Sequence, residues 1–419
     1  MNVIADLHLH SRFARACSKD ITLQNLEKFA KLKGINLLGT GDFQHPKWIT
    51  ELKSQLKDNG TGILRTKTNY PFVLQTEISL IYSQDGKGRR VHNVVLAPNF
   101  EVADQIIEYL GKKGRLDYDG RPIFNIPCPN FVEDLRKISD KIEIIPAHAW
   151  TPWFSVFGSK SGFNSLQECF LDQTKHIKAI ETGLSSDPAM NWRVSGLDNV
   201  ALISSSDSHS HWPWRIGREA TVFSMDKLNY SELIKSIREN KIAETLEFYP
   251  EEGKYHFDGH RACGTCFSPR ESLALKKICP SCKSELTIGV ANRVEELADK
   301  PEGRKPANAR PFRNLIPLSE IISHIIHAPV ASKKTWEEYM KLIAAFGNEI
   351  AVLSTPFEEL QKHTDEKIAR AISGVSTVKW RPGFDGEYGV PLFEGESVKE
   401  VKLSKNPVLK SKQKGLGEF

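Results

Sequence analysis

The chain has 419 residues, 40% of them hydrophobic and 26% charged, which is the composition of an ordinary globular protein of two or three domains. It contains no run of about 18 apolar residues, so we expect no membrane-spanning helix and no membrane partner. The net charge of +5 is compatible with a nucleic-acid partner without requiring one. The first residues lack the pattern of a signal peptide, and the odd number of cysteines, seven, argues against a disulfide framework. We therefore expect a cytoplasmic protein.

Short apolar runs alternate with amphipathic stretches over residues 1–225. The predicted strands are Val3–Leu7, Asn36–Leu38, Phe72–Ile81, Asn93–Ala97, Ile142–Pro146, Ile177–Glu181 and Val200–Ser204. Helices such as Leu23–Leu32 and Val102–Gly111 are predicted between them. Strands that alternate with helices indicate βαβ units and a parallel sheet. Seven such units favour a closed or nearly closed α/β barrel, with an open doubly wound sheet as the alternative.

The remainder of the chain divides into two further parts. We predict an α/β barrel over residues 1–250, a four-cysteine module over 251–290 and a mainly helical domain over 291–419. Residues 300–313 are rich in Pro, Gly, Lys and Arg, which predicts a surface loop. The amphipathic helices expected after this loop are Leu318–His327, Trp336–Phe346, Pro356–Lys362 and Asp365–Ser373. The lysine-rich tail from Lys399 to Lys414 either adds affinity for a nucleic-acid backbone or is simply solvated.

Histidines and carboxylates gather at the C-terminal ends of the predicted strands, the edge where active sites of parallel α/β folds form. Side chains two residues apart in a strand share a face, so His8 and His10 can bind one ion together. The other candidate ligands are Asp42, Glu77, His92, His148, Asp207 and His209. Each alone is more often an ordinary hydrogen-bonding residue, and Glu181 alone would be a helix cap. As a set they predict two or three divalent ions, Zn²⁺, Mg²⁺ or Mn²⁺, bridged by Glu77, in a metal-dependent phosphoesterase site.

The late cysteines have the spacing of a zinc ribbon, with two residues inside each pair and twelve between the pairs. The four predicted ligands of a structural Zn²⁺ are Cys263, Cys266, Cys279 and Cys282. His256 and His260 lie nearby as alternative ligands, and a redox pair is the other interpretation.

The candidate ligands follow one another in the order of the motifs of the PHP (polymerase and histidinol phosphatase) superfamily, which residues 3–223 resemble. The resemblance implies a distorted seven-stranded (β/α) barrel with three metal positions. By position, it assigns His8, His10, Glu77 and Asp207 to one ion, Glu77, His92 and His148 to a second, and Asp42 and His209 to a third. Two departures concern the third position, because Asp42 and Ala16 stand where many members have histidine.

A narrower resemblance, over essentially the whole chain, is to the endonuclease Q family. It depends on the segments 39–46, 148–154, 181–188 and 382–389 and on the four-cysteine module. The family resemblance implies a DNA repair enzyme that nicks the strand on the 5′ side of deaminated bases (hypoxanthine, uracil, xanthine) and of abasic sites, with metal-activated water as the nucleophile. Reading a damaged base normally requires flipping it out of the stack.

The residues expected to act in catalysis are Glu77, Asp207 and Arg218. Those expected to bind DNA are Arg12, Trp150, Trp153, Lys160 and Arg215, through base stacking and phosphate contacts. The alternative is that the arginines are only solvated and that at least two aromatic residues of the loop 150–163 pack beneath it.

Damaged DNA is the expected partner, with DNA-replication or repair proteins as further ones, and we expect a monomer. Two other functions stay open. One is a small-molecule phosphomonoesterase of the same superfamily, which leaves the late cysteines and the helical domain without a role. The other is a non-catalytic DNA-binding or polymerase-accessory module.

Overall fold

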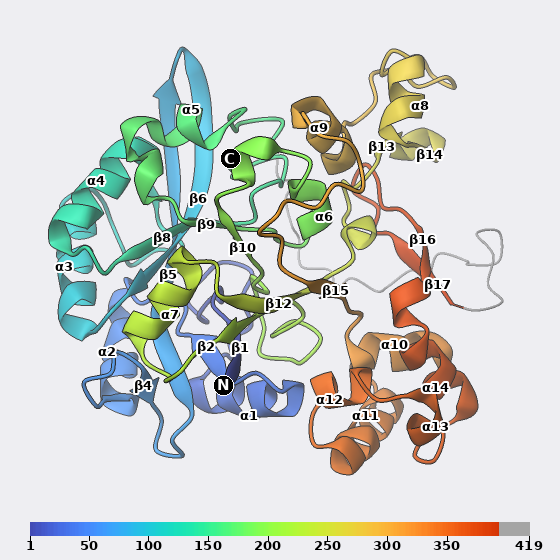
Figure 1. Cartoon of the computed structure of the whole chain (residues 1–419), viewed down its shortest axis with the longest axis horizontal. Coiled ribbons are helices and arrows are strands. Elements are labelled where there is room, and N and C mark those ends of the chain that lie inside the picture. Colours follow the sequence, from blue (N-terminus) through green and yellow to red (C-terminus); the bar gives the residue numbers. More distant parts are fainter. Residues whose placement is uncertain (394–419) are drawn as a thin grey trace.

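The computed structural model describes residues 1–393, and the tail segment from Lys399 to Lys414 lies outside the described residues. The N-terminal part is built on a large mixed sheet (Figure 1). Its strands are β1 (Asn2–Asp6), β2 (Leu37–Gly39), β3 (Lys57–Asp58), β4 (Leu64–Arg65), β5 (Pro71–Gln84), β6 (Lys87–Ala97), β7 (Ile123–Phe124), β8 (Glu143–Pro146), β11 (Ala220–Ser224), β12 (Ile242–Glu247) and β15 (Phe312–Asn314). A separate parallel pair, β9 (Ala179–Glu181) and β10 (Ala201–Ile203), lies next to β8.

All seven strands expected from the sequence are present, as β1, β2, β5, β6, β8, β9 and β10. Strands β1, β2 and β5 pair in parallel, as expected. Among the described strands, hydrogen bonding does not close a ring, because β9 and β10 pair only with each other. Leu9 and Ser208 form an isolated bridge outside these strands. The seven-stranded barrel therefore stays a prediction, while the mixed α/β sheet is present.

The expectation of an all-parallel sheet was wrong for β6, which runs antiparallel to both β5 and β8. The reason is the two-residue turn between β5 and β6. Asp85 and Gly86 have φ values of 54° and 71°, as a tight hairpin requires. A parallel pair would need a crossover connection of about a dozen residues.

Helices cover the outside of the sheet. They are α1 (Leu23–Lys33), α2 (Pro46–Gln55), α3 (Phe100–Gly111), α4 (Cys128–Ile138), α5 (Leu166–Phe170), α6 (Pro188–Asn191), α7 (Tyr230–Arg238) and α9 (Val290–Leu297). Helix α1 begins where Thr22 accepts a hydrogen bond from the backbone of Asn25 and ends at Gly34, whose φ is 100°. A side chain at Gly34 would also collide with Asn348, so this glycine allows the C-terminal domain to approach.

The C-terminal part packs around its own hydrophobic core, which includes Ile321, Tyr339 and Ile368. Its helices are α10 (Leu318–Ile325), α11 (Lys333–Phe346), α12 (Glu349–Leu353), α13 (Phe357–Leu360) and α14 (Glu366–Ser373). Figure 1 shows them together at the lower right, where α12 lies against α1. The sequence did not predict α12 or the hairpin of β16 (Lys379–Arg381) and β17 (Val390–Leu392). No helix of the described chain is long and apolar enough to span a bilayer.

Two segments connect the parts. The region 300–313, expected as a surface loop, ends in β15, which pairs with β12 and so extends the main sheet. The cysteine-bearing segment contains β13 (Asp258–His260), β14 (Thr265–Phe267) and α8 (Pro269–Ala274) and projects at the upper right of Figure 1. The domain boundaries at residues 250 and 290 stay predictions.

Candidate metal centre

The predicted ligands gather into two groups that share one carboxylate. In the first, ligand atoms of His8, His10, Glu77 and Asp207 all lie within 4.8 Å of one another. In the second, ligand atoms of Glu77, His92 and His148 meet the same limit. Glu77 is fully buried and belongs to both groups, so its two oxygens can bridge two ions.

The strand pairing explains why Glu77 and His92 meet. His92 on β6 lies opposite Ser79 on β5, and Ser79 is two residues from Glu77. Residues two apart share a face of the sheet, so the two side chains are diagonal neighbours in the hairpin. His92 Nδ1 lies 2.7 Å from Glu77 Oε1, and His148 Nε2, just after β8, lies 3.1 Å from the same oxygen.

Three predicted site residues have backbone in the left-handed region although none is glycine. The φ angles are 38° at Asp42, 30° at His148 and 46° at Asp207. Such conformations cost on the order of 1–3 kcal/mol each and persist where the surrounding structure enforces them, often at functional sites. Their concentration here supports a functional rather than a merely structural cluster.

Carboxylates hold the two histidines that follow β1. Glu181 Oε2 lies 2.8 Å from His8 Nδ1, and Asp42 Oδ1 lies 2.9 Å from His10 Nδ1. In both rings the Nε2 atom is thereby left facing Glu77 and Asp207, at 3.1 to 3.6 Å. A carboxylate on the far nitrogen is the usual way in which proteins orient a metal-binding histidine. Glu181 thus serves the centre and is not a helix cap.

The electrostatics of the centre fit bound cations. Burial alone would lower the pKa of His8, but the carboxylates of Glu181, Glu77 and Asp207 raise it well above its ordinary value. Burial lowers the pKa of His92 to about 4, so its ring is neutral and keeps a lone pair for a metal. His8 Nε2, His10 Nε2 and Asp207 Oδ1 are buried and make no hydrogen bond of normal geometry. Such atoms are costly to bury unless a cation pairs with them.

The third ion expected from Asp42 and His209 has no ligand group among the described residues. Both oxygens of Asp42 are already engaged, one with His10 and the other with the backbone N–H of Ser11 at 2.6 Å. His209 Nδ1 lies 3.0 Å from the carbonyl oxygen of Asp207, and its ring lies 4.5 Å from that of His10. Asp42 thus orients His10, and its expected role as a ligand of a third ion stays a prediction.

Among the predicted catalytic residues, Arg218 is held by the backbone just before Asp207. Its Nε and Nη2 atoms both donate to the carbonyl oxygen of Ser206, at 3.2 Å, and its guanidinium lies 5.7 Å from the Phe248 ring. It therefore braces the backbone that precedes Asp207. Its expected role in catalysis stays a prediction.

The predicted DNA-binding residues divide into engaged and exposed ones. Trp150 is only 1% exposed and donates from Nε1 to Asn191, so the expectation that it stacks on a base was wrong. Phe157 and Phe163 are equally buried beneath the same loop. Trp153, at 39% exposed, and Lys160 remain on the surface and stay candidates.

The two predicted DNA-binding arginines are held by carboxylates of the chain. Arg12 pairs with Glu51 and also donates to the carbonyl oxygen of Ile21. Arg215 lies 3.6 Å from Glu320 of α10. Both side chains are thus engaged within the chain, and a role in binding DNA stays a prediction for both.

Sequence reasoning missed Arg121, which lies inside the centre. Its Nη1 atom donates to Glu77 Oε2 at 3.2 Å. The residue precedes β7 in a segment that had no predicted element, so no strand-end pattern pointed to it. A lone arginine in a polar loop carries no signal of its own.

The cysteine module brings together a different set from the four expected cysteines. The ligand atoms within 4.8 Å of one another belong to His260, Cys263, Cys279 and Cys282. The register of β13 and β14 explains why His260 takes the place of Cys266. His260 lies opposite Thr265, and Thr265 Oγ1 lies 3.7 Å from Cys279 Sγ, whereas Cys266 lies opposite Gly259 and so points to the other face.

One thiol of the module ionises more readily than an ordinary cysteine. Backbone N–H groups of Cys282 and Ser281 lower the pKa of Cys279 to about 6. His260 Nδ1 lies 3.3 Å from Cys282 Sγ. Three thiol groups and one imidazole are a normal ligand set for Zn²⁺, so the residues fit the metal although Cys266 is not among them.

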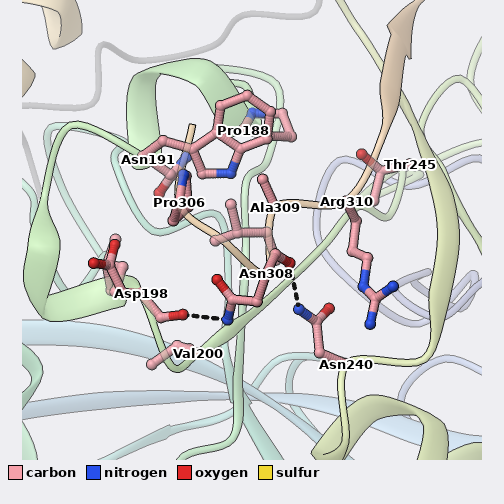
Figure 2. Close-up of a pocket in the computed structure, with 13 residues that line it drawn as sticks. Pro188, Asn191, Asp198, Val200, Asn240, Thr245, Pro306, Asn308, Ala309 and Arg310 are labelled. Atoms are coloured by element: carbon pink, nitrogen blue, oxygen red, sulfur yellow. Dashed lines mark hydrogen bonds between the residues drawn. The ribbon is translucent and has the colours of Figure 1, made fainter. Parts of the chain in front are cut away.

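A cavity elsewhere in the molecule is too small for a substrate. It lies beneath residues 306–310, beside Asp198 and Asn240, as Figure 2 shows. Its volume of about 20 Å³ is room for about one water molecule.

The mixed sheet and the shared cluster of histidines and carboxylates define an α/β protein with metal-type ligands gathered at one place. The lesion-specific endonuclease PfuEndoQ from Pyrococcus furiosus is 30% identical in sequence to this chain. Its crystal structure superposes with a TM-score of 0.85, covering 96% of this chain and 98% of that one. Endonuclease Q bound to a 27-mer duplex with an abasic lesion at its active site is also 30% identical, with a TM-score of 0.84 over 96% of this chain and all of that one. The chain belongs to the endonuclease Q family.

Two curated relatives are uncharacterized proteins. YqxK of Bacillus subtilis is 30% identical over 92% of this chain and 98% of that protein. MJ0043 of Methanocaldococcus jannaschii is 33% identical over 262 residues, and this match spans only 32% of its length. The model of the MJ0043 C-terminal domain family matches residues 317–375, a range that contains helices α10 to α14.

Proposed function

We propose that this protein is a metal-dependent DNA repair endonuclease. It hydrolyses the phosphodiester on the 5′ side of a deaminated base (hypoxanthine, uracil or xanthine) or of an abasic site, leaving a 3′-hydroxyl and a 5′-phosphate. The observation that carries this proposal is Glu77, which two ligand groups share. It occurs in a chain that is similar over almost its full length to a lesion-specific endonuclease.

The ligand residues set where the chemistry takes place. When bound, two divalent ions supply a water that loses its proton near neutral pH, and they neutralise the phosphate oxygens. Glu77 lies between the two groups, while Glu181 and Asp42 hold the rings of His8 and His10 in place. Asp207 is 25% exposed at its side chain, so the substrate phosphate can approach along this side of the first group.

Access to a damaged base requires that it leave the stack, and an exposed aromatic side chain near the centre can take its place or hold it. Trp153 follows His148 by five residues and is exposed, and Lys160 lies further along the same loop. We assign the DNA-facing rim to these two residues.

A cleavage assay tests the proposed function. End-labelled duplexes carrying one hypoxanthine, one uracil or one abasic site are incubated with the protein and Mg²⁺, Mn²⁺ or Zn²⁺, beside an undamaged duplex and a sugar phosphate. We expect a single nick 5′ to each lesion, no cut in the undamaged duplex, and loss of cleavage in EDTA or in Asp207→Asn. Phosphate release from the sugar phosphate alone would indicate a phosphomonoesterase. Binding without cleavage would indicate an accessory module.

We further propose that the cysteine module holds a structural Zn²⁺ through His260, Cys263, Cys279 and Cys282. Cys266→Ser should leave metal content unchanged. His260→Ala should weaken zinc binding by more than the roughly 100-fold that loss of an orienting partner costs, because it removes a ligand outright. The spectrum of the cobalt-substituted protein distinguishes the sets, since its sulfur-to-metal charge-transfer band grows with the number of bound thiolates. A weaker band in Cys266→Ser than in the wild type would mean that Cys266 binds the metal, as the four-cysteine prediction has it.

A further inference from the structure

The centre has two complete ligand groups and no third one among the described residues. Asp42, the expected carboxylate of a third position, has one oxygen on His10 and the other on the backbone of Ser11. Ala16 offers no ligand atom at the other place where histidine was expected. On the side of the centre next to Asp42, the cationic group that the structure places against Glu77 is therefore a side chain, the guanidinium of Arg121.

Arg121 is held on this side by its neighbours in the chain. Asp119 Oδ1 accepts the backbone N–H of Arg121 at 3.1 Å. Gln44 Nε2 donates to the carbonyl oxygen of Gly120 at 2.7 Å. A Cβ atom at Gly120 would lie 2.2 Å from Asp42 Oδ2, so only glycine lets the segment approach this closely. The backbone at Gly120 thus packs directly against Asp42, and this contact places the side chain of the next residue, Arg121, in the centre.

The guanidinium of Arg121 has further N–H groups with which it can bind an anion. One of its five N–H groups is used on Glu77, at 3.2 Å, and its side chain is 29% exposed. Arginine binds phosphate with two parallel hydrogen bonds and keeps its charge at any physiological pH. The other candidate arginines donate elsewhere, Arg12 to Glu51 and Arg218 to Ser206.

We propose that this centre works with two ions and that Arg121 supplies the remaining positive charge by binding a non-bridging oxygen of the scissile phosphate. The inference rests on the proposed function and names a phosphate-contacting residue within it. The backbone of Arg121 is attached to the segment on Asp42, so the chain itself brings this side chain to the centre.

Three measurements on the full chain test this inference. The first is cleavage of the hypoxanthine duplex by Arg121→Gln, with Arg121→Lys and Arg115→Gln for comparison. Arg115 is in the same segment but is paired with Asp117 at the surface, so Arg115→Gln should cleave like the wild type. Arg121→Gln should lose on the order of 100- to 1,000-fold in kcat, as when one transition-state donor is removed. Added guanidinium should restore part of the loss.

The second measurement is the number of ions, determined by elemental mass spectrometry. The zinc bound by cysteine thiolates is measured separately, as the zinc that a mercurial reagent releases. We expect two further ions per chain in the wild type and in Arg121→Gln. Three such ions, or loss of ions in Arg121→Gln, would overturn the inference.

The third measurement does not need cleavage. Calorimetric titration of the metal-loaded protein with inorganic phosphate should show at least tenfold weaker binding in Arg121→Gln than in the wild type or Arg115→Gln. Equal binding, or equal kcat, would overturn the role of Arg121. If the wild type does not cut any damaged duplex, the proposed function fails, while the ion count and the phosphate titration still decide on Arg121.

Discussion

Replacing Glu77 by glutamine is expected to abolish cleavage and to deprive both ligand groups of their shared member. Glu77 is fully buried and contacts His10, His92 and His148. The amide keeps the volume of the side chain but removes its charge and one acceptor oxygen. Loss of an orienting partner lowers metal affinity or activity by about 10- to 100-fold, and a bridging ligand should cost more.

The measurement combines cleavage of a hypoxanthine duplex with the ion content after dialysis. Glu143→Gln is the matched control. Glu143 is also buried, but it pairs with Arg238 at 2.6 Å, away from the ligand groups. If Glu77→Gln retains both ions and cuts at more than a tenth of the wild-type rate, Glu77 is not a bridging ligand.

The second large effect concerns the contact between helix α1 and the helical domain. Lys33→Met should destabilise the protein by about 3–5 kcal/mol, because it leaves a buried charge on Glu349. Lys33 Nζ lies 2.6 Å from Glu349 Oε1, and both side chains are almost fully buried. Glu349 also accepts hydrogen bonds from the backbone N–H of Leu318 and from Tyr339. These two donors remain in the variant, so the lower end of the range is expected.

Urea denaturation measures this loss. Lys31→Met is the control on the same helix, since the Lys31 side chain is 53% exposed and its partner Glu27 also accepts a hydrogen bond from Thr68, so a smaller loss is expected. In the double variant Lys33→Met/Glu349→Gln, which removes the stranded charge but keeps an acceptor oxygen among the buried donors Leu318 and Tyr339, the destabilisation should be smaller than in Lys33→Met alone. A loss in Lys33→Met no larger than in Lys31→Met would mean that the pair contributes nothing to docking.

Much of the centre could be predicted because its ligands lie at the ends of apolar strands. The spacing of His8 and His10 and the order of the later motifs depend only on local sequence, and the structure places the residues of two predicted groups together. The direction of β6 was also predictable in principle. Asp85-Gly86 between two β-rich runs is a strong hairpin signal, but the alternation of strands and helices outweighed it in our interpretation.

The remaining differences depend on features that sequence spacing does not carry. Cys266 has the right spacing for a knuckle, yet strand register turns it away and brings His260 in. Trp150 has the composition of a stacking residue, yet tertiary packing buries it. Arg121 is far from the ligands in sequence, and only the seating of Gly120 on Asp42 brings it to Glu77.

The loop that follows Asp207 is held from both sides. Asp6, on β1, accepts the backbone N–H of Gly217, while Lys33 donates to the carbonyl oxygen of Pro213 and also pairs with Glu349 of the helical domain. Docking of that domain and the placement of a metal ligand therefore share one segment of chain. By thermodynamic reciprocity, ions bound at Asp207 should tighten the attachment of the helical domain by the same free energy with which its attachment raises their affinity. A fragment that ends before Leu318 would accordingly be a poorer metal binder than the whole chain.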